Sequence, residues 1–301
     1  MQDTGAVRHR LDAAIGVEVT GVDLSRPLGD ADLRTMTDAL NRHAVLLLRD
    51  QQLDPKSLAA VARRFGPLER FKMLQPKSPE HAERYLCPEE PDISLIGNLR
   101  ANGKRIAIFT NGAPDWHIDY MYRPRPNRCT LLYAVETPPV GADTLFSSLE
   151  AAYDALDEAL KREIDDLQGI YSVERLDEFF RLSEPERPLL RADTIAANPP
   201  AIHPLVRRHP ATGRKGLFLA PNALSHFDGM SREESLALAE RLFEHAIRPA
   251  FHYRHVWRNG DFLLWDNLTT LHSATLFDGE RHRRLLYRAM IGASPESAPP
   301  P

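Results

Sequence analysis

The chain has few cysteines, no long apolar run and no large excess of charge of either sign. Only Cys87 and Cys129 are present among its 301 residues, so it holds neither a disulfide framework nor a CxxC motif. Such sparse cysteine is typical of a reducing compartment, and we predict a cytoplasmic protein. Residues 1–16 lack the apolar segment of a secretory signal, and no apolar run is long enough to span a bilayer.

Charge is nearly balanced, with 38 Lys and Arg against 42 Asp and Glu and a net charge of −4. This balance argues against nucleic acid or an anionic membrane as the main partner, because both favour a strongly basic surface. Hydrophobic residues make up 43% of the chain, as in ordinary globular proteins. We predict a single domain over residues 1–301, with flexible tails at 1–14 and 294–301.

Helices and strands are predicted in separate parts of the chain. Helical spacing or capping marks four segments: 30–44, 54–66, 147–169 and 231–246. Short apolar or β-branched runs predict strands in four others: 43–50, 128–148, 251–274 and 283–292. Asp54 can cap the second helix, and Ser231 with Glu234 has the spacing of a capping box before the fourth. The pattern indicates a β-rich α+β fold with helices packed outside the sheets.

Two long segments, 69–115 and 171–202, show no clear periodicity. Long irregular loops in a compact domain often serve as lids or binding loops. Plain surface insertions fit the same pattern, and the sequence leaves both interpretations open.

The short motif that points most directly to chemistry is His117-Ile118-Asp119, within "PDWHIDY". If this segment is a strand or the end of one, the His and Asp side chains point the same way, because side chains alternate along a strand. His272, in the strand-like "WDNLTTLHSA", is the best candidate for a third ligand. Two His and one carboxylate form the facial triad of non-haem Fe(II) oxygenases, which leaves three coordination positions open. A zinc hydrolase or a non-catalytic metal-binding jelly-roll sensor is an alternative use of the same residues.

Two arginines stand in the strand-like run "RRLLYRAMI". Arg284, Leu286 and Arg288 share one face of that strand, and guanidinium groups on an apolar strand are costly to bury unless anions meet them. Arginine is suited to bidentate capture of carboxylates, so an acidic ligand is indicated. Pairing with internal Asp or Glu is the alternative.

These motifs follow one another in a fixed order. The stretches "WHID", "GADTLF", "WDNLTTLHSA" and "RRLLYRAMI" come after an opening "IGVEVTGVDLSRPL". The ordered set resembles the TauD/TfdA family of Fe(II)- and 2-oxoglutarate-dependent dioxygenases, from about Ile15 to Ile291. The resemblance implies the family fold, a double-stranded β-helix of jelly-roll, cupin-like type with flanking helices. It also implies Fe(II), 2-oxoglutarate and O2 as the cofactor and cosubstrates.

The resemblance assigns the metal first. His117, Asp119 and His272 match the family's iron ligands and are the expected catalytic residues. The implied reaction hydroxylates a C–H bond while 2-oxoglutarate is converted to succinate and CO2. Where the hydroxylated carbon bears a heteroatom, the product can then break apart. Halogenation is not expected, because that chemistry usually needs the carboxylate ligand replaced, and Asp119 is present.

The resemblance also assigns the cosubstrate. Arg284 matches the residue that pairs with the distal carboxylate of 2-oxoglutarate, and Thr144 matches the threonine whose hydroxyl supports it. Arg288 matches a residue near the metal-proximal end of 2-oxoglutarate, so it is expected to bind the cosubstrate, and in several members this residue also helps hold an acidic substrate. The family's "GGDT" reads "GADT" here, with Ala142 in place of the second glycine, a small departure.

For the substrate itself we expect a small organic acid, such as a carboxylate or sulfonate. Tyr122 shares the parity of His117 if the strand continues, and Asn222 falls where the family often places a substrate-facing residue. Taurine is not expected, because the stretch before His117 does not match the taurine enzymes. We also expect a homo-oligomer, either a dimer or a tetramer. Four further residues are interpreted as structural: Trp116, Trp265, His203 and His209.

Overall fold

The computed structural model describes residues 6–108 and 115–292 of the chain. The predicted tail at 294–301 lies outside the described residues. Within the predicted tail at 1–14, strand β1 (Val7–Arg10) pairs antiparallel with strand β2 (Val17–Thr20). The prediction of a flexible tail is therefore wrong for β1, because its four residues are all matched to partners in β2.

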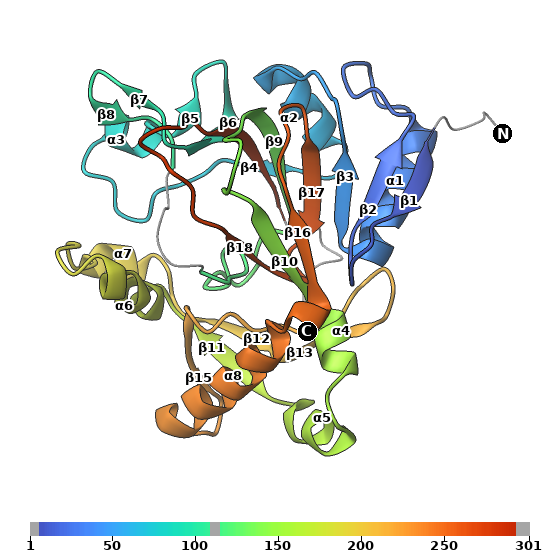
Figure 1. Ribbon diagram of the computed structural model, residues 1–301. Coiled ribbons are helices and arrows are strands. Elements are labelled where there is room, and N and C mark those ends of the chain that lie inside the picture. The colour runs from blue at the N-terminus through green and yellow to red at the C-terminus, as the bar shows by residue number, and fades with distance from the viewer. Residues whose placement is uncertain (1–5, 109–114, 293–301) are drawn as a thin grey trace.

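The largest element of the fold is a nine-stranded sheet (Figure 1). Besides β1 and β2 it contains β3 (Val45–Leu48), β4 (Leu68–Glu69), β5 (Leu86–Cys87), β6 (Glu90–Gly97), β9 (Cys129–Glu136), β17 (Phe262–Asp266) and β19 (Leu285–Ile291). The order is β1-β2-β3-β17-β9-β19-β6-β5, with β4 paired to β19. Strands from both ends of the sequence are thus neighbours, and β9 and β17 lie at the centre.

Smaller sheets complete the β structure. One consists of β16 (His252–His255), β10 (Thr144–Ser148) and β18 (Thr270–Ala274), in that order. Another consists of β12 (Ala201–Pro204), β11 (Gln168–Tyr171) and β15 (Leu224–Phe227). Two hairpins pair β13 (Val206–Arg208) with β14 (Lys215–Leu217) and β7 (Arg100–Ala101) with β8 (Lys104–Arg105).

The helices form where caps and apolar spacing allow them. They are α1 (Asp30–His43), α2 (Pro55–Arg63), α3 (Pro79–Glu83), α4 (Leu149–Asp154), α5 (Glu158–Ile164), α6 (Val173–Ser183), α7 (Ala192–Ala196), α8 (Arg232–Ala246) and the 3-10 helix η1 (Pro249–Phe251). The Asp54 carboxylate accepts from the Ser57 N–H at 2.7 Å, and both halves of the Ser231–Glu234 capping box are present, so both predicted starts are confirmed. The helix expected over 147–169 is two helices instead, because Asp157 caps a new start at α5.

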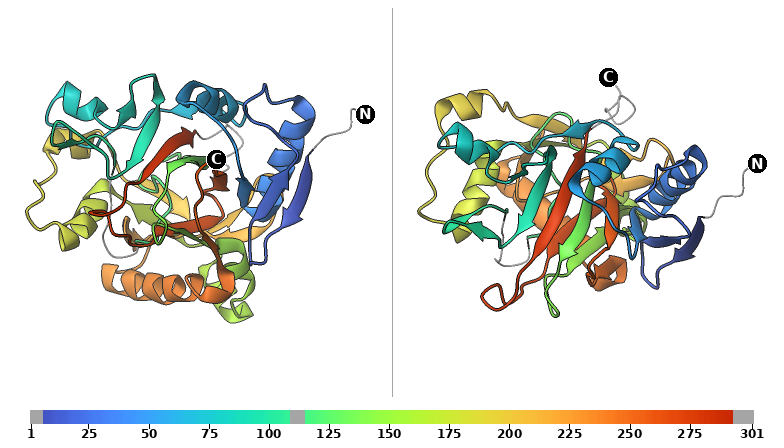
Figure 2. Two further views of the ribbon diagram at one scale, coloured as in Figure 1. Left: turned by 45° about the horizontal axis from the view of Figure 1, so that its top comes forward. Right: turned by 90° about the horizontal axis from the view of Figure 1, so that it is seen from above.

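Both faces of the main sheet are covered by other elements. Successive residues of its strands therefore pack alternately into one core and the other. In β3, Leu46 and Leu48 belong to the core that contains residues of α1 and α2, whereas Val45 and Leu47 belong to the core shared with β10 and β16. In Figure 2 the longer helices, such as α1 in blue and α8 in orange, lie at the outside of the molecule. A mixed fold with a large sheet and flanking helices is thus confirmed. The space between the main sheet and β16-β10-β18 is where the candidate site lies.

The two segments without clear periodicity contain more structure than predicted. The eight-residue strand β6 pairs with β19, and the eleven-residue helix α6 is capped by Ser172. The expectation of irregular loops is wrong for these parts. For α6 the sequence held usable information, since a serine cap precedes Val173 and Leu176 at helical spacing.

Candidate active site

His117 and His272 are joined through their backbones. His117 is not part of a strand but forms an isolated antiparallel bridge with His272 of β18. The N–H of each residue donates to the carbonyl of the other at 3.0 Å. Residues paired in this way project their side chains to the same side, and the two ring centroids are 4.2 Å apart. Tertiary pairing therefore places two imidazoles from distant parts of the chain side by side.

Asp119 completes a three-residue cluster. Its Oδ1 lies 3.8 Å from Nε2 of His117 and 3.9 Å from Nε2 of His272. The three ligand atoms all lie within 4.8 Å of one another, around a common space. Within residues 6–108 and 115–292, no other set of three His, Cys, Asp or Glu side chains comes together in this way. The donor set and its convergence fit a divalent metal ion.

The protonation states of the cluster suit a metal ligand set. The Nδ1–H of His117 donates to the carbonyl of Asp115 at 2.8 Å, which leaves the Nε2 lone pair facing Asp119. Burial lowers the pKa of His272 to about 3, so this imidazole is neutral. Burial works to raise the pKa of Asp119, but the charge of Arg288 and a hydrogen bond from Thr130 oppose it, and that pKa lies below its usual value.

A tight turn follows Asp119. The expectation that Tyr122 faces the same side as His117 required a strand that continues through both residues, and the structure has a turn there instead. Tyr120 has φ +56°, in the left-handed region, and the Arg123 N–H donates to the Tyr120 carbonyl at 2.9 Å. The imidazole of His203 bonds the carbonyls of Met121 and Arg123, both at 3.0 Å. His203 thus supports the turn and is not a member of the metal cluster.

Other residues interpreted as structural also lie in packed surroundings. His209 Nε2 contacts Asp266 at 3.1 Å, while its Nδ1 accepts from the Thr212 N–H, and both ring positions are therefore used. Trp265 is buried, and Trp116 packs partly buried against the core that contains Ile118.

Arg284, directly before β19, and Arg288, within it, are largely buried but keep guanidinium nitrogens without protein partners among the described residues. Arg284 directs Nη2 to the Ala142 carbonyl at 3.4 Å, and Arg288 directs Nε to the Ser94 hydroxyl at 3.1 Å. The Nε of Arg284 and the Nη2 of Arg288 are buried without a hydrogen-bond partner among the described residues. The charge of the Asp143 carboxylate works to raise the pKa of Arg284, but this carboxylate forms its salt bridge with Arg254, at 2.6 Å. Internal pairing, the alternative left open by the sequence, is therefore not found for these two side chains in the described part of the chain.

Arg284 is held in place by its backbone. The Asn98 Oδ1 accepts from the Arg284 N–H at 2.9 Å, and the Asn98 N–H donates to the Arg284 carbonyl at 3.2 Å. Gly97 makes this approach possible, since a Cβ there would lie 1.9 Å from the Arg284 carbonyl oxygen. Burial lowers the pKa of Arg284 to about 10, which still leaves it charged at neutral pH.

Thr144 is the first residue of β10. It lies two residues after Ala142, whose carbonyl accepts from the Arg284 guanidinium. Its hydroxyl oxygen accepts from the indole N–H of Trp257 at 3.0 Å, so its own proton remains free to donate. In the preceding turn Ala142 has φ +57°, a conformation that costs a residue with a Cβ about 1 kcal/mol. The replacement of glycine by Ala142 thus leaves the turn formed, at the expense of modest strain.

Tyr122 and Asn222, two residues predicted to contact substrate, have different surroundings. Tyr122 lines a cavity of about 530 Å³ together with Arg123, Arg125 and Asn198, close to the turn after Asp119. Asn222 is buried between β14 and β15, next to Ala223, which shares a core with Ile118. The structure thus gives Tyr122 a cavity to face, and the role of Asn222 stays a prediction.

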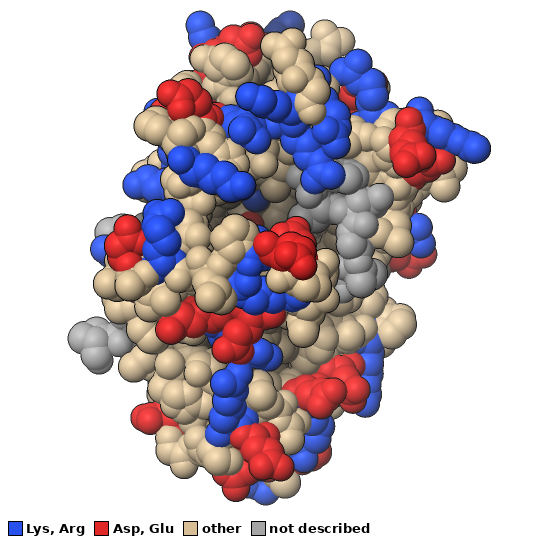
Figure 3. Space-filling model, turned by 90° about the vertical axis from the view of Figure 1, so that its left-hand side faces the viewer, with Lys and Arg blue, Asp and Glu red and all other residues tan. Residues whose placement is uncertain are grey.

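The face that carries α3, β7, β8, α6 and α7 is hollowed and bordered by Lys and Arg side chains (Figure 3). On this face the side-chain amide of Gln75 joins the two long segments. Its Nε2 donates to the Leu189 carbonyl at 3.0 Å, and its Oε1 accepts from the Arg191 N–H at 2.7 Å. The two segments are therefore held together by one side chain.

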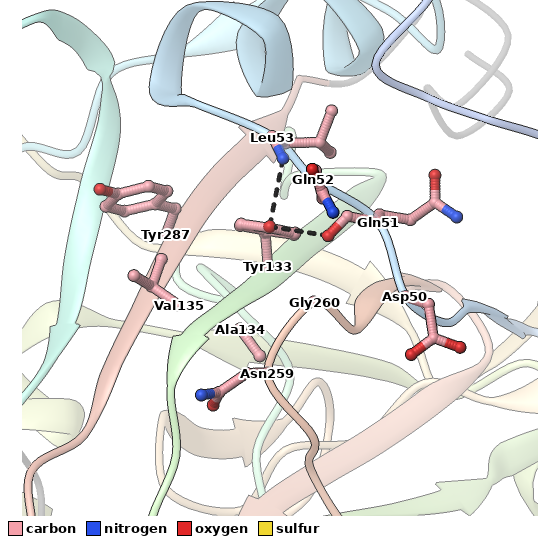
Figure 4. Close-up of a pocket in the computed structure, with 10 residues that line it drawn as sticks. All are labelled: Asp50, Gln51, Gln52, Leu53, Tyr133, Ala134, Val135, Asn259, Gly260 and Tyr287. Carbon is pink, nitrogen blue, oxygen red and sulfur yellow. Dashed lines mark hydrogen bonds between the residues drawn. The ribbon is translucent and has the colours of Figure 1, made fainter.

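A second cavity, of about 370 Å³, lies on the other face of the main sheet (Figure 4). There the Tyr133 hydroxyl donates to the Gln51 carbonyl at 3.0 Å and accepts from the Leu53 N–H at 3.1 Å. Tyr133 belongs to the core beneath α1 and α2, whereas Trp265 belongs to the opposite core. This cavity is therefore separate from the metal cluster.

Sequence reasoning missed several residues that contact the predicted ones: Ser94, Asn98, Thr130 and Trp257. Thr130 donates to Asp119 Oδ2 at 2.6 Å. In the buried stretch "CTLLYA", two residues carry a hydroxyl group, Thr130 and Tyr133. A polar residue within an apolar strand is the feature that could have identified Thr130.

Comparison with known proteins agrees with this geometry. Residues 8–290 match the family described as "Taurine catabolism dioxygenase TauD, TfdA family". The chain belongs to the TauD/TfdA family of dioxygenases. The family inferred from the ordered motifs is thus confirmed.

Individual relatives of this TauD/TfdA chain cover nearly its whole length. It is 34% identical over 277 residues to the α-ketoglutarate-dependent 2,4-dichlorophenoxyacetate dioxygenase of Cupriavidus pinatubonensis, covering 92% of this chain and 93% of that protein. It is 34% identical over 291 residues to the (S)-phenoxypropionate/α-ketoglutarate-dioxygenase of Sphingobium herbicidovorans, covering 95% of each. The crystal structure of AAD-2 with Mn(II) and N-oxalylglycine matches 96% of this chain and 98% of that one, with a TM-score of 0.77 and 29% identity.

Proposed function

We propose that this protein is an Fe(II)- and 2-oxoglutarate-dependent dioxygenase that hydroxylates a small organic acid. The observation that carries the proposal is the convergence of His117, Asp119 and His272 on one space. Two imidazole nitrogens and one carboxylate oxygen suit Fe(II) and leave positions open for further ligands. The named α-ketoglutarate dependence of relatives 34% identical to this chain supports the same reaction class.

When bound, the iron and 2-oxoglutarate supply the oxidation: one atom of O2 ends in succinate with loss of CO2, and the other in the new hydroxyl group. The organic acid thus gains one oxygen at a C–H bond, and no other reductant is needed. Where that carbon also bears an ether oxygen, the product is a hemiacetal that splits into a carbonyl compound and an alcohol.

Arg284 and Thr144 are proposed to hold the distal carboxylate of 2-oxoglutarate. Arg284 is buried and charged, and its Nε has no partner among the described residues. The Thr144 hydroxyl accepts from Trp257 and so has its proton to give. A carboxylate accepts from both groups and offsets the buried positive charge.

Arg288 is proposed to hold the acidic group of the substrate. Ser94 fixes its Nε, its buried Nη2 has no partner among the described residues, and its charge acts on Asp119. The guanidinium carbon lies 5.2 Å from the centroid of the Phe71 ring, which offers an apolar surface beside the cation. Relatives named for phenoxyacetate and phenoxypropionate support an acid with an apolar body.

Tyr122 and Asn222 are proposed as walls of the substrate pocket. Burial raises the pKa of Tyr122, so its phenol stays neutral near pH 7. The cavity beside Tyr122 also presents Arg125, which favours an acidic substrate, whereas Arg123 there is paired with Glu69 at 3.0 Å.

We further propose that the main sheet and β16-β10-β18 form the two sides of a double-stranded β-helix, within one domain. The metal cluster between these sheets supports that assignment. A cytoplasmic location is supported by Cys87 and Cys129, which are both buried and unpaired. In the described part of the chain no helix is long and apolar enough to cross a membrane. A dimer or tetramer stays a prediction.

The reaction is tested by supplying the protein with Fe(II) and 2-oxoglutarate without air, then admitting O2. We expect succinate release that increases when the correct acid is present in a screen of carboxylates, sulfonates and aryloxy acids. Product formation with Zn(II) and without O2 would establish the hydrolase alternative instead. Metal binding without any succinate release would favour the sensor. Neither alternative is favoured by an observation here, since the matched family is one of dioxygenases.

A further inference from the structure

Asp119 is connected to the core by three consecutive hydrogen bonds. The indole N–H of Trp265 donates to Oδ1 of Asn267 at 2.9 Å. The amide Nδ2 of Asn267 donates to the Thr130 hydroxyl at 3.0 Å, and that hydroxyl donates to Oδ2 of Asp119 at 2.6 Å. Thr130 and Asn267 have no exposed surface, and Trp265 is 2% exposed. We call this series the Trp265 relay.

The direction of the relay is fixed by chemistry. An indole nitrogen only donates, so the oxygen of the Asn267 amide faces Trp265 and its NH2 group faces Thr130. The Thr130 oxygen then accepts from Asn267, and its single proton is left for Asp119. Hydrogen bonds that run in one direction polarise one another in a buried setting. One oxygen of the carboxylate is therefore always engaged as an acceptor.

The backbone holds the relay rigidly. Thr130 of β9 and Trp265 of β17 are direct partners at the centre of the main sheet. The Asn267 N–H donates to the Arg128 carbonyl at 2.8 Å, which fixes the residue just beyond the end of β17. Since strand register fixes Thr130 and Trp265, and this backbone hydrogen bond fixes Asn267 in the turn after β17, the relay is suited to precise positioning of a side chain.

We propose that Trp265, Asn267 and Thr130 are positioning residues that make Asp119 a ligand through Oδ1 alone. Oδ2 is occupied by Thr130, while Oδ1 is the oxygen that faces His117 and His272. A carboxylate that binds through one oxygen leaves a coordination position free that a two-oxygen ligand would take. The relay thereby preserves room for the cosubstrate. This inference rests on the proposed metal site.

The test uses Co(II) binding to the full-length protein, followed by visible absorption and calorimetry. Thr130→Val keeps the shape of the side chain and removes the donor, whereas Thr130→Ser keeps the donor. We expect Co(II) affinity to fall about ten- to a hundredfold in Thr130→Val, the range typical for loss of a hydrogen-bond partner of a metal ligand, and to stay within threefold in Thr130→Ser.

The relay also predicts how the effects of substitutions at two of its residues combine. Trp265→Phe keeps the aromatic packing but removes the N–H, and its effect passes only through Asn267. We expect a severalfold loss of Co(II) affinity for Trp265→Phe in the wild-type background and no further loss in the Thr130→Val background, because coupled positions are not additive. If the losses of Co(II) affinity caused by Trp265→Phe and Thr130→Val simply add in the double variant, the relay is overturned.

Ser147→Ala is the matched control. Ser147 is also fully buried, but its hydroxyl donates to the Ala246 carbonyl at 2.5 Å, at the end of α8 and away from the cluster. We expect Ser147→Ala to lower the melting temperature without changing Co(II) affinity. Equal Co(II) affinity in Thr130→Val and Ser147→Ala would overturn the proposal. Absence of Co(II) binding by the wild-type protein would instead refute the metal site itself, so the two failures are distinguishable.

Discussion

At the ligand end of the site, the atoms of His117 and Asp119 that face away from the cluster are bonded to the protein. His117 Nδ1 meets the Asp115 carbonyl, and Asp119 Oδ2 meets the Thr130 hydroxyl. At the arginine end, Arg284 Nε and Arg288 Nη2 are buried without hydrogen-bond partners among the described residues. At the ligand end the protein itself satisfies these buried polar atoms, whereas at the arginine end it leaves them without a partner.

The difference supports the proposed division into groups that bind a metal and groups that bind an anion. A buried donor without a partner costs about 1–3 kcal/mol, and more if it is charged. Such a cost is expected where a ligand supplies the missing acceptor. Metal ligands, by contrast, need fixed orientations before the ion binds, which protein hydrogen bonds provide. His272 is intermediate: its Nδ1 lacks a partner in the described part of the chain, but Trp265 and Phe146 pack against its ring.

The largest effect is expected from loss of a ligand. His272→Ala removes one of the three converging atoms, and activity should fall by more than the roughly hundredfold typical of losing an outer hydrogen-bond partner. Steady-state succinate release and metal content measure it. His226→Ala, a histidine of β15 outside the cluster, is the control and should retain both. Full metal content in His272→Ala would contradict the ligand assignment.

At the arginine end, Arg284→Met should act on the cosubstrate and not on stability. Hydrogen bonds to a charged group are worth about 1.5–3 kcal/mol, so the KM for 2-oxoglutarate should rise roughly ten- to a hundredfold. The melting temperature of the ligand-free protein should not fall, because a buried unpaired charge is replaced by an apolar group. Arg283→Met, at an exposed neighbouring position, is the control. An unchanged KM would mean that Arg284 does not bind 2-oxoglutarate.

Arg288→Met should affect the organic acid more than the cosubstrate. We expect the KM for the acid to rise about tenfold, since one charge-assisted contact is lost, while the KM for 2-oxoglutarate changes less than threefold. Both constants are measured in the same succinate assay. If only the 2-oxoglutarate constant changed, the assignment of Arg288 to the substrate would be wrong.

A smaller, pH-dependent effect is expected where His203 supports the turn after Asp119. Burial lowers the pKa of His203 to about 4, against an ordinary value of 6.5 in the unfolded chain. Protonation below pH 6.5 therefore favours unfolding, so this stability is fully present above pH 6.5 and is lost as the pH falls towards 4, by up to about 3 kcal/mol. Denaturant unfolding of wild type and His203→Gln from pH 7 to 4 measures the difference. Parallel pH curves for the two proteins would exclude this role.

The smallest effect is expected at Gln75, which joins the two long segments. Gln75→Ala removes the two hydrogen bonds that join the long segments, each worth about 1 kcal/mol at most on an exposed surface. We expect the KM for the acid to rise about threefold and limited proteolysis after Leu189 to become faster. Gln52→Ala, in the cavity on the other face of the sheet, is the control. Unchanged proteolysis would show that Gln75 does not hold the segments together.

How much the sequence predicted varies between parts of the site. His117, Asp119 and His272 were predictable because metal ligands are confined to a few residue types, and the ordered motifs added family information. The reasoning about Tyr122 used strand parity and was wrong in its premise, because His117 lies outside any strand and a left-handed residue, Tyr120, turns the chain directly after Asp119. Residue type is visible in a sequence, whereas a local change in backbone direction is not.

The sequence by itself determined the chemistry available to this protein: two imidazoles, one carboxylate, two arginines four residues apart near the last strand and an alternation that buries both faces of the main sheet. The tertiary structure decided which of these groups are satisfied by the protein. The bridge between His117 and His272 and the pairing of Thr130 with Trp265 join residues more than a hundred positions apart. Hydrogen bonds form between neighbours in space, and only folding determines who those neighbours are.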